Sequence, residues 1–273
     1  MKKAISVVCL LLVLVSCNRK NNSSNNSNDN PGNSTVPVDT VVMPQVYIDN
    51  ILPTIEDSIE YTQALSARRR PVPKPKPTPV IIPTGTYVIY VNVKGGTVTS
   101  EYWNNGQTFT VEPSLMTAYE FSFALDKAQR IYAPYNVIIT DSVEVYNRAT
   151  KKMIVYVCPR PAFMPPGASG YSFVGTLSTS TPAFVFSDLL YNIGQYVGSI
   201  VAHELGHSVG MRHQSVWDAS CVLTNPYRPN TCMGNGLYDD LPPWITGTTP
   251  VSCTSSQNDH QILTNVLGVK ANL

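Results

Sequence analysis

Residues 203–213 read His203-Glu204-Leu205-Gly206-His207-Ser208-Val209-Gly210-Met211-Arg212-His213, the pattern H-E-x-x-H-x-x-G-x-x-H. The chain has 273 residues and four histidines, and three of the histidines lie in this stretch. A composition with so few histidines gives the whole pattern by chance roughly once in a million chains. The stretch therefore predicts a metal site, and with it a fold that can hold one.

The spacing of the pattern has a physical reason. Residues four apart lie on one face of a helix, so His203 and His207 can direct two imidazole nitrogens at one metal ion about 2 Å away. Gly210 can adopt a positive φ, end the helix and let His213 reach the same ion. Three protein ligands leave a fourth position open, which is typical of catalytic Zn²⁺. We expect one such ion, with Glu204 as the base that accepts a proton from water.

The motif resembles that of the metzincin clan of zinc metalloendopeptidases. In that clan a tight turn follows the third histidine, and its methionine forms an apolar floor beneath the metal. Met233, within Thr231-Cys232-Met233-Gly234, follows His213 by 20 residues and is similar to that methionine. Some members of the clan use a tyrosine two residues after the methionine as a ligand. Tyr238 follows by five residues, so we assign it no such role.

The resemblance implies an α/β (α+β) fold: a twisted mixed sheet, an active-site helix and an irregular C-terminal subdomain, all within residues 85–273. β-branched and aromatic runs predict strands, and apolar residues at helical spacing predict helices. The expected strands are 87–93, 137–140, 153–157, 173–177 and 183–186, and the expected helices are 114–132, 193–209 and 257–267. We expect residues 172–177 to be an edge strand that binds a substrate backbone by strand addition.

The N-terminus has the features of a bacterial lipoprotein signal peptide. Residues 1–16 have a basic start and an apolar run too short to span a membrane. Leu14-Val15-Ser16-Cys17 resembles a lipobox, which implies cleavage before Cys17 and a lipid anchor on it. An ordinary secretory signal that happens to contain Cys17 is the alternative. The predicted location is the bacterial cell envelope.

Residues 17–84 have the composition of a tether. Residues 18–34 hold eight Asn and four Ser, a composition that cannot bury enough apolar surface to become ordered. A short helix is possible within 54–67. Arg68-Arg69-Arg70 then precedes six prolines in 71–83, which predict an extended spacer. The three arginines are a solvated linker, a processing site that frees the catalytic domain, or a contact for anionic lipid.

Six cysteines are present, and Cys9 lies in the signal peptide. Four cysteines fall within the expected domain, and an even number in an exported protein favours two disulfides. They are Cys158, Cys221, Cys232 and Cys253. Of the three possible pairings, we favour Cys221–Cys232 with Cys158–Cys253.

The predicted function is that of a zinc metalloendopeptidase whose partners are protein or peptide substrates and, through the lipid anchor, a membrane. We expect a monomer. The net charge of +1 gives no reason to expect nucleic acid binding. Two alternatives stay open: a non-catalytic surface-binding lipoprotein on a peptidase fold, and a zinc hydrolase of a non-peptide amide.

Overall fold

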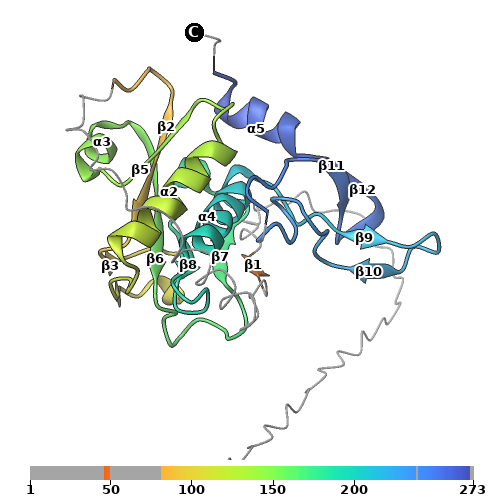
Figure 1. Cartoon of the computed structure of the whole chain (residues 1–273), viewed down its shortest axis with the longest axis horizontal. Coiled ribbons are helices and arrows are strands. Elements are labelled where there is room, and N and C mark those ends of the chain that lie inside the picture. The colour runs from red at the N-terminus through yellow and green to blue at the C-terminus, as the bar shows by residue number, and fades with distance from the viewer. Residues whose placement is uncertain (1–45, 50–80, 238, 271–273) are drawn as a thin grey trace, which may run out of the picture. The chain divides into compact units, whose positions relative to one another are not determined.

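The computed structural model describes residues 46–49, 81–237 and 239–270 (Figure 1). The chain divides into two units, Met1–Val42 and Met43–Leu273, and all described residues belong to the second. The predicted signal peptide, Cys17, most of the tether and Tyr238 lie outside the described residues. None of the helices in the described part of the chain combines the length and apolar character that a bilayer crossing requires.

Six strands form one mixed sheet in the order β1-β7-β8-β6-β2-β5. The pairs β2–β5, β2–β6 and β6–β8 are parallel, whereas β7 runs antiparallel to β8 and β1 runs antiparallel to β7. The strands are β1 (Val46–Asp49), β2 (Tyr87–Asn92), β5 (Val137–Thr140), β6 (Lys151–Cys158), β7 (Gly170–Phe173) and β8 (Ala183–Phe186). The fold is therefore a mixed α/β arrangement.

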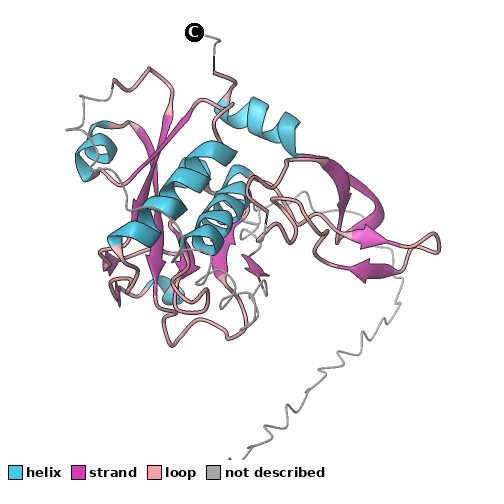
Figure 2. Ribbon diagram, in the orientation of Figure 1, coloured by secondary structure: helices cyan, strands magenta, loops and turns pink. Residues whose placement is uncertain are grey.

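Two helices, α2 (Ala118–Ile131) and α4 (Gly194–Val209), lie side by side across one face of this sheet (Figures 1 and 2). Alternate strand residues such as Ile89, Val91 and Val155 belong to the core beneath them. The two helices approach closely because Gly198 has no side chain. A Cβ there would lie 2.7 Å from the backbone oxygen of Ala124.

The opposite face of the sheet has its own apolar cover. The hairpin β3 (Gly96–Val98) and β4 (Phe109–Val111) contributes to a second cluster that contains Trp103, Tyr156 and Phe184. The short helix α3 (Val143–Arg148) packs on β2, where Val88 meets Val145. Because both faces are covered, the central strands are almost wholly buried.

The C-terminal part consists of two small ribbons and one helix, to the right of and above the sheet in Figure 1. The elements are β9 (Val216–Trp217), β10 (Leu223–Asn225), β11 (Thr246–Thr249), β12 (Ser252–Asn258) and α5 (Asp259–Leu267). The sequence predicted an irregular region before the last helix. The β9–β10 ribbon was missed because its strands have only two and three residues, and the β11–β12 ribbon because its strands are rich in Ser and Thr rather than in apolar residues.

Several boundaries differ from the expected ones. The first long helix begins after Thr117, whose side chain accepts a hydrogen bond from the N–H of Glu120, rather than after Ser114. The strand expected at 173–177 lies at Gly170–Phe173, because Thr176 leads into a short 3₁₀ turn at Leu177–Thr179. Strand β1 was not expected, since it falls in the segment that was assigned to the tether. The expectation of an edge strand at 172–177 is wrong, because β7 pairs with β1 on one side and with β8 on the other.

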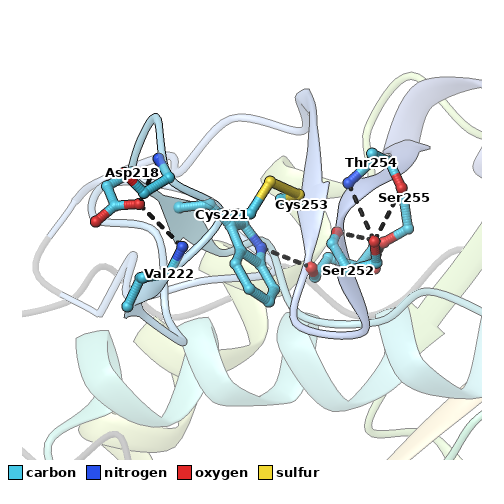
Figure 3. Close-up of a disulfide and its surroundings, with 10 residues drawn as sticks. Asp218, Cys221, Val222, Ser252, Cys253, Thr254 and Ser255 are labelled. Atoms are coloured by element: carbon cyan, nitrogen blue, oxygen red, sulfur yellow. Dashed lines mark hydrogen bonds between the residues drawn. A yellow bond between two sulfur atoms is a disulfide. The ribbon is translucent and has the colours of Figure 1, made fainter.

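The favoured cysteine pairing is wrong. Cys221, in the turn between β9 and β10, is bonded to Cys253 of β12, and their Cα atoms are 5.4 Å apart (Figure 3). Cys158 and Cys232 are free and buried. Cys158 belongs to the cluster on the sheet face away from α4, and Cys232 to the core beneath α4, so neither can reach the outer ribbons.

The two free thiols should be inert in the folded chain. Burial, with a smaller contribution from Asp188, raises the pKa of Cys158 to about 12, and burial raises that of Cys232 well above its ordinary value. Very little of Cys158 is then a thiolate at pH 8, and the thiolate is the reactive form. Peptide mapping after iodoacetamide treatment should find both residues unmodified until the chain is unfolded. A peptide containing Cys221 joined to Cys232 would contradict the pairing described here.

Candidate metal centre

Helix α4 supplies the first two histidines from the middle of the core. All its residues from Tyr196 to Val209 are buried. The helix ends at Gly210, whose φ is +122° and whose N–H donates to the carbonyl oxygens of Gly206 and His207. Glycine adopts this conformation without the steric cost that a side chain would add. The chain then leaves the helix axis and brings His213 back toward the face of α4 that carries His203 and His207.

Both helical imidazoles are oriented by backbone carbonyls. The Nδ1 of His203 lies 2.6 Å from the oxygen of Cys232, and the Nδ1 of His207 lies 2.8 Å from the oxygen of Met211. A carbonyl oxygen can only accept, so each Nδ1 carries the proton and donates it. The Nε2 of a neutral ring then has a lone pair available for a cation, as in most histidine metal sites.

The structure brings the three histidines together. Their ligand atoms all lie within 4.8 Å of one another, and the Nε2 atoms of His207 and His213 are 3.1 Å apart. Two nitrogens bound to one tetrahedral zinc stand about 3.3 Å apart, which follows from zinc–nitrogen distances near 2.0–2.1 Å. His203, His207 and His213 expose at most 4% of their surface. This group therefore has the donors, the spacing and the burial of a metal site.

The carboxylate of Glu204 lies between α4 and strand β7. Glu204 is fully buried. A Cβ built at Gly170 of β7 would collide with the Glu204 carboxylate, so the two residues are in direct contact. Ser172, two residues further along β7, lies 2.7 Å from Ser208 of α4 through their hydroxyl oxygens. The face of β7 that points toward α4 therefore forms one wall beside the candidate site.

Met233 lies beneath α4 at the level of the two helical histidines. It is fully buried, and a Cβ built at Gly206 would collide with its sulfur. The surrounding residues 231–234 form a tight turn closed by a hydrogen bond from the N–H of Gly234 to the oxygen of Thr231. The same segment presents the Cys232 carbonyl to His203.

A buried lysine holds the loop that follows this turn. Lys127 of α2 is 2% exposed and donates through Nζ to the backbone oxygen of Asp239 at 2.5 Å. Burial lowers the pKa of Lys127 to about 8, although Asp240 raises it in part. The ammonium thus links α2 to the segment that carries Met233.

The third histidine is positioned by its neighbours in the chain. Gln257 accepts from the N–H of Arg212 (2.7 Å) and donates to the oxygen of the same residue (2.9 Å). Gln214 donates through its side chain to Asp259 (2.9 Å), as Gln257 does (2.8 Å). Residues on both sides of His213 are therefore tied to the start of α5.

Asp259 is the centre of this clamp and is fully buried. Burial raises the pKa of its carboxyl, while hydrogen bonds from Gln214 and Gln257 and from the N–H of Ile245 act in the opposite direction. A buried carboxyl with several donors is costly to leave unpaired, so the clamp has one well-defined arrangement.

Sequence reasoning missed several residues of this site. Tyr227 packs against His213 with ring centroids 4.8 Å apart, and nothing in its local sequence marks it. Gly170 was missed because a contact between a strand and a helix 34 positions later leaves no periodic signal. Gln257 and Asp259 were noted only as the start of the last helix, and no spacing rule ties them to residue 213.

Comparisons with known proteins add no identification. No protein-family model matches the chain, and no curated protein matches it. The site must therefore be interpreted from its own geometry.

Metal binding can be tested with the fourth histidine as a control. His260 is exposed and contacts Tyr135 instead of the cluster. Zinc added to the chelator-treated chain should bind with a stoichiometry of one and raise the melting temperature. Binding to the folded state at a hundred times Kd contributes about 2.7 kcal/mol. His213→Ala should lose both effects in calorimetry and thermal unfolding, and His260→Ala should keep them. Equal zinc binding by the two variants would contradict the assignment.

Proposed function

We propose that this chain is a zinc-dependent endopeptidase similar to the metzincins. Zn²⁺ is held by His203, His207 and His213, and Glu204 is the general base. The observation that carries the proposal is the group of three buried imidazoles, with the buried Glu204 next to the first of them in the sequence of α4. The buried methionine turn beneath the two helical histidines supports the resemblance to this clan.

The donor set suits zinc. Neutral imidazole is a common ligand of zinc, and three such ligands leave one coordination position for water or substrate. A bound zinc ion would supply positive charge that acidifies a water molecule and polarises a carbonyl group. The carbonyls of Cys232 and Met211 hold the imidazole rings in the tautomer that this requires.

Glu204 performs the proton transfers in this proposal. Its carboxylate takes a proton from the attacking water and later delivers a proton to the nitrogen of the leaving amine. Glu204 follows His203 on α4, and its contact with Gly170 fixes its carboxylate toward β7. The near-absence of solvent around it strengthens the electrostatic interactions that the reaction uses.

A peptide is the favoured substrate because β7 is the sheet strand next to Glu204. Beyond β7 the described sheet carries only β1, a strand of four residues, so an extended chain that replaced β1 would pair with β7. Strand addition recognises the peptide backbone itself, which a glycan amide does not offer. This observation favours the peptidase over the non-peptide hydrolase, and the presence of Glu204 favours it over a purely binding role.

Replacement of Glu204 separates binding from catalysis. Glu204→Gln should retain one zinc per chain but lower casein or peptide cleavage by about 10²–10⁴-fold, the usual contribution of a general base. Cleavage would be followed with a quenched fluorescent peptide, and zinc by atomic emission. Glu144→Gln makes the same change on the exposed helix α3 and should leave cleavage unchanged.

Three outcomes would count against the proposal. Cleavage at an undiminished rate by Glu204→Gln would show that Glu204 is not the general base. Zinc binding without cleavage of any protein, peptide or glycan amide would favour the binding lipoprotein. Cleavage of a glycan amide alone would favour the alternative hydrolase.

We also propose that the mature chain is attached to the bacterial envelope through lipid on Cys17. The support is the sequence Leu14-Val15-Ser16-Cys17 after an apolar run and before a polar, Asn-rich segment. Acyl chains contribute about 0.8 kcal/mol for each CH₂ that they bury in a bilayer, so two or more chains hold a protein stably.

Cys17→Ser should abolish the attachment. The variant chain should leave the membrane pellet and the detergent phase of a Triton X-114 partition, because it has no acyl chain to bury. Immunoblots of both phases measure this, and Cys9→Ser is the matched control within the signal peptide. Equal partition of Cys17→Ser and the unchanged chain would contradict the proposal that Cys17 carries a lipid.

A further inference from the structure

The sheet edge beside the candidate site is already occupied by the chain's own N-terminal segment. Strand β1 pairs antiparallel with β7, with Val46 opposite Phe173, Tyr47 opposite Ser172, Ile48 opposite Tyr171 and Asp49 opposite Gly170. β1 is the outermost strand of the six. It uses the backbone groups of β7 that would otherwise be free to pair with another chain.

The paired stretch of β7 is the part that adjoins the metal centre. Gly170, opposite Asp49, is the residue whose added Cβ would collide with the Glu204 carboxylate. Ser172, opposite Tyr47, is hydrogen-bonded to Ser208 of α4. A backbone laid along β7 in this register therefore passes directly beside the candidate catalytic carboxylate.

We propose that the outer edge of β7 is a docking surface for an extended peptide, and that residues 46–49 occupy it as an internal competitor. The docked peptide runs antiparallel to β7. Part of this inference rests on the proposed function, because occupation of the edge reduces cleavage only if the chain is a peptidase. Occupation itself can be measured without any catalysis.

The burial of Glu204 agrees with a form of the protein that does not admit substrate. Glu204 exposes none of its surface, so a substrate carbonyl cannot meet it in this conformation. A strand in the same chain also competes strongly, since covalent linkage can give an effective concentration in the millimolar range. A peptide substrate at micromolar concentration would be outcompeted by β1 about a thousandfold if both had equal intrinsic affinity.

The sequence between β1 and the first strand of the remaining domain contains a point where the tether can be cut. Arg68-Arg69-Arg70 follows β1 and precedes β2 in the chain. Cleavage there converts an intramolecular pairing of four residues into an intermolecular one, which such a short strand cannot sustain at low concentration. In this proposal the arginine cluster is the point at which an external trypsin-like protease releases β1.

Two consecutive prolines test the pairing in the full-length chain. Adjacent residues of an antiparallel strand alternate in pointing their N–H toward the partner. Tyr47→Pro/Ile48→Pro therefore removes at least one ladder hydrogen bond whichever residue donates, because proline has no N–H. Val41→Pro/Val42→Pro, just before β1, is the matched control. Circular dichroism and zinc stoichiometry equal to those of the unchanged chain establish that each variant is folded.

The first readout is the binding of a fluorescent peptide with the sequence of residues 43–52. The peptide should bind the Tyr47→Pro/Ile48→Pro chain at least a hundredfold more tightly than the unchanged chain or the control, as measured by fluorescence anisotropy. Amide exchange measured by NMR should show Tyr171, Ser172 and Phe173 all protected in the unchanged chain. In the double variant, the amides among these three whose N–H points toward β1 should exchange faster, and those that point away from β1 should not.

The second readout is cleavage of a quenched fluorescent peptide, which should rise at least tenfold in the double variant. Equal peptide binding and equal amide protection in all three chains overturn the proposed occupation of the edge. Peptide binding that improves while measurable cleavage stays constant overturns competition with substrate. If no chain cleaves anything, the peptidase proposal fails, and the binding and exchange results still decide whether β1 occupies the docking surface.

Discussion

Two hydrogen bonds determine whether this site exists: those from the Nδ1 atoms of His203 and His207 to the carbonyls of Cys232 and Met211. They set the tautomer and the direction of both rings, and so the side on which the lone pairs lie. Neither carbonyl belongs to α4. Both come from the chain beyond Gly210, so the geometry of the helix is necessary for the site but does not suffice to build it.

Much of the C-terminal part of the fold serves to hold those carbonyls in place. Lys127 ties the loop after Met233 to α2, and the clamp around Asp259 ties residue 212 to Gln257 of β12 and residue 214 to Asp259 of α5. The disulfide Cys221–Cys253 joins the two outer ribbons that connect these segments. A loop-rich region that buries little apolar surface gains its rigidity from such polar and covalent links.

The sequence predicted the parts of the site whose spacing is local. Histidines four apart on a helix, and a glycine that ends the helix, follow from the period of the α-helix and from the freedom of φ at glycine. The strands at 137–140 and 183–186 were likewise predicted at their observed bounds. Their apolar, β-branched or aromatic residues are buried in the sheet, where such side chains pack well.

What could not be predicted depends on contacts between distant segments. Cys221 pairs with Cys253 because two ribbons happen to approach each other, and sequence alone leaves three pairings open. Gln257 reaches Arg212 across 45 positions, and β1 reaches β7 across more than 120. Four residues such as Val46–Asp49 carry too little pattern to be identified as a strand before their partner is known.

The clamp on His213 has a consequence for biosynthesis. Gln257 and Asp259 belong to the last elements of the chain, whereas β1 is the first strand in it. A chain that is delivered N-terminus first, from the ribosome or across a membrane, has β1 available before Gln257 and Asp259 arrive. The candidate metal site is therefore completed in a chain whose sheet edge can already be filled by β1. On the proposed function, β1 can cover the sheet edge before the hydrolytic centre is complete.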